Sequence, residues 1–311
     1  MILLGIFAAS GAGAAVSVAG YVAGGSQNAS ARVTTIDKFA YPAETRTTLA
    51  TGLSAGRTSP AAFSNPSVAG YVAGGSEASR VSTVDKFVFP ADTRTSLATG
   101  LSAAINSNTG MANDGVAGYS GGGFTGTFTA TVDKFAYSDD SRTSLATGLS
   151  VGRSSMGGMN NAAVAGYFAG GATRSGLDIY STVDKFAFPS DSRTTLGTGL
   201  SQSRSSPAGF SNDGVAGYIA GGDLVGHESA VIDKFAFPSD TRTTLGATLS
   251  SGRRLGAGFD NPAVAGYATG GRNNNIRTAV VDRIDFTTDT RTSLGTGLSA
   301  ARSESAGFQN A

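Results

Sequence analysis

The sequence contains no cysteine, no tryptophan and a single histidine, His227. Without cysteine the chain can form neither disulfides nor thiolate metal sites. A metal centre or a Ser-His-Asp triad would have to use His227, which lies in the polar segment 226–229 with no nucleophile-elbow pattern beside it. None of the glycine-rich runs has the spacing of a phosphate-binding loop. We therefore expect no catalytic residue, no metal site and no cofactor, and predict that the protein is not an enzyme.

Excess charge of either sign is also lacking. The chain has 23 Lys and Arg against 22 Asp and Glu, a net charge of +1, so no overall field would attract nucleic acid. The apolar opening, residues 1–10, lacks the basic start of a signal peptide and is short for a membrane span. We expect neither a nucleic-acid partner nor a membrane span.

A repeat occupies almost the whole chain. The motif Val-Ala-Gly-Tyr recurs, and a Val/Ile-Asp step follows it at spacings of 48, 48, 51, 49 and 49 residues. The six tyrosines of the motif are Tyr21, Tyr71, Tyr119, Tyr167, Tyr218 and Tyr267, and the six acids are Asp37, Asp85, Asp133, Asp184, Asp233 and Asp282. A period of this length is typical of solenoids and propellers.

The two chain ends favour a closed ring. Residues 305–310 match residues 206–212, which open an earlier unit, whereas the first unit has no clear copy of that strand before Val18. Each end therefore supplies what the other lacks, and open stacks would instead need polar caps. We predict an all-β, six-bladed β-propeller over residues 14–311, closed by the C-terminal strand, with residues 1–13 as a separate segment.

Each unit predicts a four-stranded antiparallel blade. In the unit that starts at Arg57, short apolar segments separated by turn residues predict strands over 60–63, 68–73, 82–89 and 93–101. Alternation in the third strand places two phenylalanines on one side, where we expect them to pack between blades.

The order of signals resembles the kelch repeat. A basic residue (Arg57) precedes the inner strand, an aromatic (Tyr71) precedes a glycine pair, and the third strand carries an acid (Asp85). The resemblance covers all six units, although one unit has Ile105 in place of the basic residue. The sequence departs from many kelch units in having no tryptophan, and an arginine such as Arg94 leads into the outer strand instead. The resemblance implies a propeller that serves as an interaction module.

The repeated charges fit a structural role, because a catalytic group should occur once and these occur in every unit. An acid stands two residues before each outer-strand arginine, and an Asp-Lys or Asp-Arg pair lies in each third strand. We interpret these groups, and the arginines before the inner strands, as turn-capping and inter-blade pairs. One unit has Ile105 in place of that arginine, which indicates either a specialised blade or neutral drift.

The segments after the glycine pairs differ most between units. In a four-stranded meander these loops emerge on one face, together with the connections between blades, and loops on a rigid scaffold commonly carry binding residues. The alternative is that these loops merely tolerate drift. The candidate binding residues are Arg80, Phe124, Arg174, Tyr180, His227, Arg272 and Asn274.

The N-terminal segment is a candidate attachment device, because the ring closes without it and its apolar residues need cover. Its apolar residues are Ile2, Leu3, Leu4, Ile6 and Phe7. An apolar start followed by small residues is similar to the start of some bacteriophage tail and fibre proteins. We therefore expect a structural or adhesion component of a virion or other extracellular assembly, with protein partners, further copies of itself, or a host-surface glycan or protein as the ligand. The alternatives are a cellular kelch-type interaction module and a glycan-binding lectin.

Overall fold

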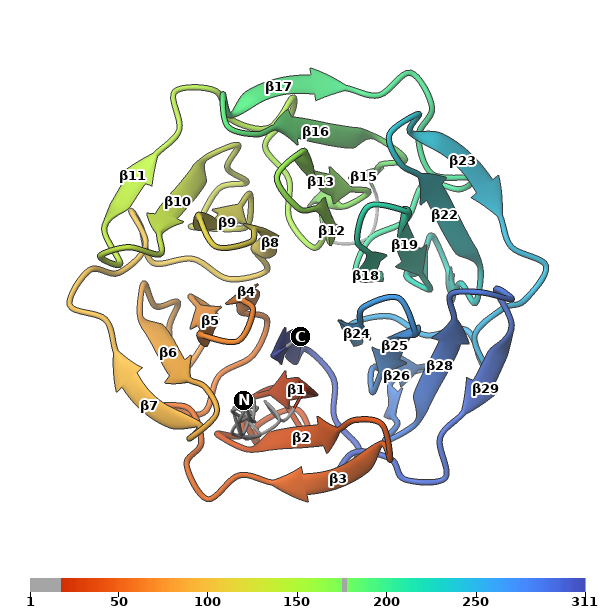
Figure 1. Cartoon of the computed structure of the whole chain (residues 1–311), viewed down its shortest axis with the longest axis horizontal. Helices are drawn as coiled ribbons and strands as arrows, with labels where there is room; N and C mark the ends of the chain where they lie inside the picture. Colours follow the sequence, from red (N-terminus) through yellow and green to blue (C-terminus); the bar gives the residue numbers. More distant parts are fainter. Residues whose placement is uncertain (1–17, 175–177, 311) are drawn as a thin grey trace, which may run out of the picture.

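The computed structural model describes residues 18–174 and 178–310, which form a ring of six four-stranded antiparallel sheets around a central axis (Figure 1). Within these residues every element is a β-strand. The inner strands are β30 (Ala306–Asn310), β4 (Ala61–Asn65), β8 (Thr109–Asn113), β12 (Gly157–Asn161), β18 (Ala208–Asn212) and β24 (Ala257–Asn261). The second strands are β1 (Ala19–Ala23), β5 (Ala69–Ala73), β9 (Ala117–Gly121), β13 (Ala165–Ala169), β19 (Ala216–Ala220) and β25 (Ala265–Thr269). We number the blades 1 to 6 in this order.

The third and outer strands complete each blade. The third strands are β2 (Ile36–Ala40), β6 (Val84–Val88), β10 (Val132–Ala136), β16 (Val183–Ala187), β22 (Ile232–Ala236) and β28 (Val281–Asp285). The outer strands are β3 (Thr45–Thr48), β7 (Thr93–Ser96), β11 (Arg142–Ser144), β17 (Ser192–Thr195), β23 (Thr241–Thr244) and β29 (Arg291–Ser293). Blades 4 to 6 each carry a further two-stranded hairpin after the second strand. These hairpins are β14 (Ala172–Arg174) with β15 (Asp178–Ile179), β20 (Asp223–Leu224) with β21 (His227–Glu228), and β26 (Arg272–Asn273) with β27 (Ile276–Arg277).

The C-terminal strand closes the ring, as predicted. Strand β30 pairs antiparallel with β1, so that Phe308 lies opposite Tyr21 and Asn310 opposite Ala19. The last strand of the chain thus becomes the inner strand of blade 1, whose other three strands come from the N-terminal part (Figure 1).

Small residues at the centre of the inner strands let the blades approach the axis closely. A Cβ atom added to Gly209 would lie 2.1 Å from the carbonyl oxygen of Gly158 in the preceding blade. A Cβ atom never approaches a carbonyl oxygen so closely, so this spacing requires glycine. The glycine of Val-Ala-Gly-Tyr has a similar reason, since a Cβ on Gly118 would lie 1.9 Å from the ring of Phe63.

Aromatic side chains fill the spaces between blades. In blade 2, Tyr71 stacks on Phe63 with ring centroids 5.2 Å apart, and on Tyr137 of blade 3 at 5.5 Å. Phe87 and Phe89 of blade 2 both contact Phe308 of blade 1, which confirms the predicted inter-blade packing. The core is therefore distributed around the ring in one layer per blade interface.

A polar clasp joins each blade to the next at the same layer. The Tyr71 hydroxyl donates to Asp140 of blade 3 at 2.8 Å, and the Lys86 ammonium reaches the other oxygen of that carboxylate at 2.7 Å. Burial and the Asp140 charge raise the pKa of Tyr71 well above its ordinary value, so the phenol remains a neutral donor. The acid before each outer-strand arginine is therefore an inter-blade partner, as predicted. The equivalent acids are Glu44, Asp92, Asp191, Asp240 and Asp289.

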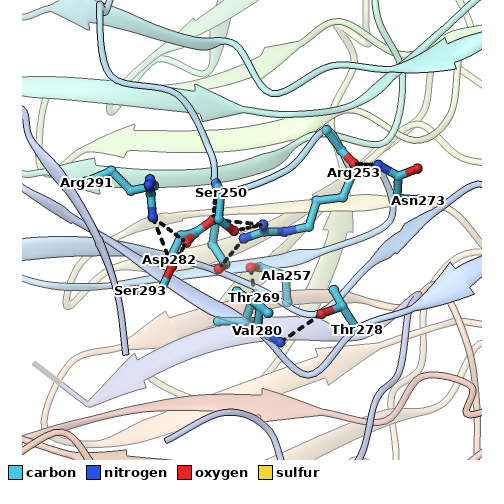
Figure 2. Close-up of polar contacts among 12 residues, drawn as sticks. Ser250, Arg253, Ala257, Thr269, Asn273, Thr278, Val280, Asp282, Arg291 and Ser293 are labelled. Atoms are coloured by element: carbon cyan, nitrogen blue, oxygen red, sulfur yellow. Dashed lines mark hydrogen bonds and ion pairs between the residues drawn. The ribbon is translucent and has the colours of Figure 1, made fainter. Parts of the chain in front are cut away.

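The arginines that precede the inner strands do not link blades, and this corrects the sequence interpretation. Figure 2 shows Arg253 paired with Asp282 of its own blade, at 2.8 Å, with both side chains almost wholly buried. The backbone N–H and the hydroxyl of Ser250 donate to the same carboxylate oxygen, each at 2.8 Å. The two side chains meet because the connection that leads to the inner strand is bonded to Asp282 through Ser250, three residues before Arg253.

Strand boundaries also differ from the prediction by up to five residues, most of all at the end of the outer strand. The outer strand of blade 2 ends at Ser96 and not near residue 101, because Leu101 leaves the sheet, donates its N–H to the Ser82 carbonyl at 2.8 Å and is buried. The inner strand runs on to Asn65, whose side-chain oxygen accepts the N–H of Gly115 in blade 3 at 3.2 Å. The predicted turn therefore begins two residues later.

Candidate binding funnel

The two ends of the propeller differ in chemistry. The turns between inner and second strands lie at one end and expose an equivalent valine in five blades, so this end repeats itself around the axis. These valines are Val68, Val116, Val164, Val215 and Val264. The loops after the glycine pairs and the connections between blades lie at the other end, where the six blades differ.

A closed ring of backbone hydrogen bonds forms the narrow part of the variable end. One residue from each blade donates its N–H to the carbonyl of its counterpart in the preceding blade, over distances of 2.6 to 2.9 Å. These residues are Ser59, Ser107, Ser155, Ser206, Leu255 and Glu304, and all have positive φ between 52° and 63°. Such a conformation costs about 1 kcal/mol or more for a residue with a side chain. The hydrogen-bonded circle offsets this cost and sets the width of the opening.

Above this ring the walls widen into a funnel of about 640 Å³. In each blade, the residue that follows the glycine pair forms a β-bridge with the residue just before that blade's member of the hydrogen-bonded ring. Asp223, for example, pairs with Ser205 in this way. The six equivalent residues are Ser26, Ser76, Phe124, Ala172, Asp223 and Arg272, and the last four of them line the funnel. The scaffold is therefore repeated, while the chemistry of the wall changes from blade to blade.

One side of the funnel is charged, with Arg254 and Arg272 beside Asp223 and Glu304. Arg254 forms ion pairs with Asp223 and, at 3.5 Å, with Glu228. Arg272 lies across from Arg254 and exchanges two backbone hydrogen bonds with it, at 2.9 and 3.1 Å. The guanidinium of Arg272 makes no hydrogen bond or ion pair with any residue that the structure describes, and its Nε atom is buried without a partner. Burial first, and then the neighbouring charges of Arg254 and Arg277, lower the pKa of Arg272, although the charges of Glu304 and Asp223 partly oppose this shift. Arg272 is thus a cation that nearby acids influence without forming an ion pair with it.

The opposite side of the funnel is aromatic. The rings of Phe124 and Phe128 lie 5.0 Å apart at an angle of 52°, and both line the funnel. The guanidinium of Arg80 lies over the Phe124 ring, 5.1 Å from its centroid, within the range of a cation–π contact. This side offers an apolar surface with a fixed orientation.

A second hollow of about 300 Å³ adjoins the funnel between the hairpins β20–β21 and β26–β27. His227 and Asn274 line it, together with Asp223, Glu228 and Arg254 from the charged side of the funnel. The backbone N–H of Asn274 donates to Glu228 at 3.3 Å and so ties the two hairpins together.

The structure brings together most of the predicted binding residues. Phe124 and Arg272 line the funnel, Arg80 stacks on Phe124, and His227 and Asn274 line the adjoining hollow. Tyr180 lies outside both and is within hydrogen-bond distance of the Thr173 hydroxyl, at 3.2 Å. Arg174 ends strand β14. The predicted attachment residues Ile2, Leu3, Leu4, Ile6 and Phe7 lie outside the described residues.

Sequence reasoning missed four residues of this region. Phe128, Asp223 and Arg254 line the funnel, and Glu228 lines the hollow beside it. Arg254 carried a usable signal, because the other units have a small polar residue at its position. These equivalents are Thr58, Asn106, Ser154, Ser205 and Ser303.

The described residues contain no group of three or more His, Cys, Asp and Glu side chains arranged to hold a metal ion. In the part of the chain that the structure covers, no helix has the length and hydropathy needed to cross a bilayer.

Comparison with known proteins supports the fold alone. No family model and no curated protein matches the sequence. Among solved structures, that of YjhT superposes with a TM-score of 0.70 at 15% identity, over 90% of this chain and 98% of YjhT. The chain is therefore a six-bladed β-propeller that shares its architecture with YjhT.

Proposed function

We propose that this protein is a non-enzymatic binding component of a larger assembly, which presents its funnel to a partner and is attached through its N-terminal segment. The observation that carries the proposal is the contrast between the two ends. Six repeated blades hold one end nearly uniform, while the wall of the funnel combines a charged side, which includes the unpaired guanidinium of Arg272, with an aromatic side. Variable side chains on a rigid scaffold are typical of recognition surfaces.

The funnel chemistry favours a protein partner that offers an acidic group beside an apolar one. Arg254 is already neutralised by Asp223, whereas the guanidinium of Arg272 forms no ion pair with any of the described residues. A carboxylate placed against Arg272 would gain a charge-assisted hydrogen bond in a partly desolvated setting. An apolar side chain of the same partner would then contact Phe124 and Phe128.

The repeat pattern supports assigning the propeller to the kelch-like class. The proposed location is a virion or another extracellular assembly. It rests on the near-neutral, cysteine-free composition and on the apolar N-terminal segment, which is similar to the start of some phage tail and fibre proteins. The host-side ligand would be a surface protein or glycan.

Substitutions copied from sibling blades test the funnel. Arg272→Ser and Phe124→Ser introduce the residue that Ser76 already supplies at the same position of blade 2. Val164→Ser, at the opposite end, is the matched control. Peptides selected on the wild-type protein from a random display library would be measured by biolayer interferometry. We expect each funnel variant to weaken binding at least tenfold and the control to leave it unchanged; unchanged binding in both funnel variants would contradict the proposal.

The attachment role is tested separately. Light scattering would compare the full chain with a form that lacks residues 1–13. A full-length assembly beside a folded, monomeric truncated form supports an attachment segment. Two monomers would instead favour a cellular kelch-type interaction module, or a lectin if a glycan array gave the ligand.

A further inference from the structure

Five of the six blades contain the same buried ion pair, between the arginine that precedes the inner strand and the aspartate of the third strand. In blade 2, Arg57 donates to Asp85 at 2.9 Å and to the Val72 carbonyl at 3.1 Å, and the Ser54 hydroxyl lies 3.3 Å away. Both charged side chains are fully buried. The equivalent pairs are Arg302–Asp37, Arg153–Asp184, Arg204–Asp233 and Arg253–Asp282, all at 2.8 to 2.9 Å; Figure 2 shows the last of them.

Blade 3 keeps the acceptors of this site but lacks the cation. Ile105 stands where the other blades have arginine. The Asp133 carboxylate still accepts the N–H and hydroxyl of Ser102, each at 2.8 Å, and the Ser144 hydroxyl at 2.6 Å. Its remaining charged neighbour is Arg142 at 3.5 Å, the outer-strand arginine that accompanies this carboxylate in every blade. Asp133 therefore has one guanidinium fewer than its five counterparts.

A cavity occupies this position. Ile105, Ser102, Ser120 and Asp133 line it, and its volume is about 40 Å³. One water molecule needs roughly 10–15 Å³ of such a volume, so the cavity holds about three or four heavy atoms. The Asp133 side chain is 5% exposed, whereas the equivalent carboxylates in the other blades are 0% exposed. The cavity therefore gives solvent a route to the carboxylate.

The polarity of the lining has changed along with the missing charge. Ser120 replaces the apolar residue that Val72 represents in blade 2, and its hydroxyl accepts a hydrogen bond from the buried Asn108 amide at 2.7 Å. That hydroxyl keeps its own proton available as a donor. An apolar repair of the lost arginine would instead have filled the space and left no polar lining.

We propose that this cavity binds a small guanidinium-type cation, which takes the place that the arginine side chain has in the other five blades. Guanidinium has four heavy atoms in a plane, and its N–H groups match the carboxylate and serine oxygens that hold Arg57 in blade 2. The shared chemistry has two sources, a free cation and the arginine side chain of a partner. Ile105 occupies the path of the arginine stem, so only the head group needs to be supplied.

Titration calorimetry with methylguanidinium tests the proposal. The wild-type protein should bind one cation per chain, and the melting temperature should rise with concentration until the site is saturated. Ile105→Arg, which fills the site from within, and Asp133→Asn, which removes the charge, should both abolish the heat and the rise. Arg57→Ile together with Val72→Ser, which copies Ile105 and Ser120 of blade 3 into blade 2, should raise the stoichiometry from one to two.

Further arms separate the possible ligands. Arginine amide binding more tightly than methylguanidinium assigns the site to a partner's side chain, and the reverse order assigns it to a free cation. Potassium or methylammonium binding as well as methylguanidinium would overturn the guanidinium assignment. Equal responses of the wild type and Ile105→Arg, or no response in the wild type, would overturn the site. A crystal grown with methylguanidinium gives a check that needs no variant, because the cation must appear beside Asp133.

Discussion

Two matched single variants, one in each of two neighbouring blades, should separate the contribution of the buried ion pair to stability from that of the hydrogen bonds around it. Asp85 and Asp133 occupy the same position in blades 2 and 3, and both accept the N–H and hydroxyl of a serine. Asp85→Asn also leaves the fully buried Arg57 without its counter-ion. Asp133→Asn leaves no buried arginine without a counter-ion, because blade 3 has Ile105 at that position. Removing one partner of a buried pair costs about 3–5 kcal/mol, while a lost hydrogen bond costs about 1–2 kcal/mol.

We therefore expect Asp85→Asn to lower the free energy of unfolding by at least ~2 kcal/mol more than Asp133→Asn does. Urea denaturation followed by circular dichroism measures both, since a guanidinium denaturant would bind the proposed cavity. Adding Arg57→Ile to Asp85→Asn should recover most of the loss, because the stranded charge disappears. Equal losses in the two single variants would refute the reasoning, as it would mean that Arg57 does not need its counter-ion.

The same carboxyl predicts acid sensitivity. Burial opposes ionisation of Asp85, but the Arg57 charge and the hydrogen bonds of Ser96 and Ser54 outweigh it and lower its pKa below the ordinary 3.8. The unfolded chain then binds the proton more readily than the folded one. The stabilisation is therefore complete above about pH 4 and is lost as the pH falls through the folded-state pKa. Asp85→Asn should flatten this part of the stability curve.

Three more substitutions test other parts of the ring. Burial raises the pKa of Asp260 to about 7, so the folded chain holds this proton more tightly than the unfolded chain does. The free energy of unfolding should therefore fall by up to about 4 kcal/mol as the pH rises from 4 to 7. Asp260→Ser should remove that dependence in urea titrations at each pH. Tyr71→Phe removes the hydroxyl that donates to Asp140 and should cost about 1–3 kcal/mol in the same assay; no loss would show that the clasp is energetically idle. Gly209→Ala should cost about 1–3 kcal/mol through the contact with Gly158, and a melting temperature equal to that of the wild type would contradict the close approach.

The ring was predictable because its signals recur. Six copies of Val-Ala-Gly-Tyr and the complementary chain ends specify six blades and their closure, and β30 pairs with β1 as expected. The acid two residues before each outer-strand arginine was correctly assigned to the blade interface, since it bonds Tyr71 and its equivalents. Periodicity of this kind is read from the chain without knowledge of distances.

The buried pair and the funnel were harder to predict for a physical reason. Arg57 and Asp85 are 28 residues apart in the sequence. They meet only in the folded chain, where the connection between blades is bonded to Asp85 through Ser54. The hairpins of blades 4 to 6 form in segments too short and too polar to show strand alternation, such as Asp223 to Glu228. The funnel was therefore located by the variability of its loops, whereas the partners of Arg254 depended on the folded geometry.

Repetition also explains how one blade can change without loss of the ring. Each blade contacts mainly its two neighbours, so a substitution within one blade is felt locally. Replacing a buried ion pair by an apolar residue of similar volume is often neutral in stability, but Ile105 is shorter than arginine and Asp133 remains. The result is a cavity beside a carboxylate, which neither a complete pair nor a complete apolar repair would leave. The other five blades have an arginine at the position of Ile105, so comparison with them indicates that the missing group is a guanidinium.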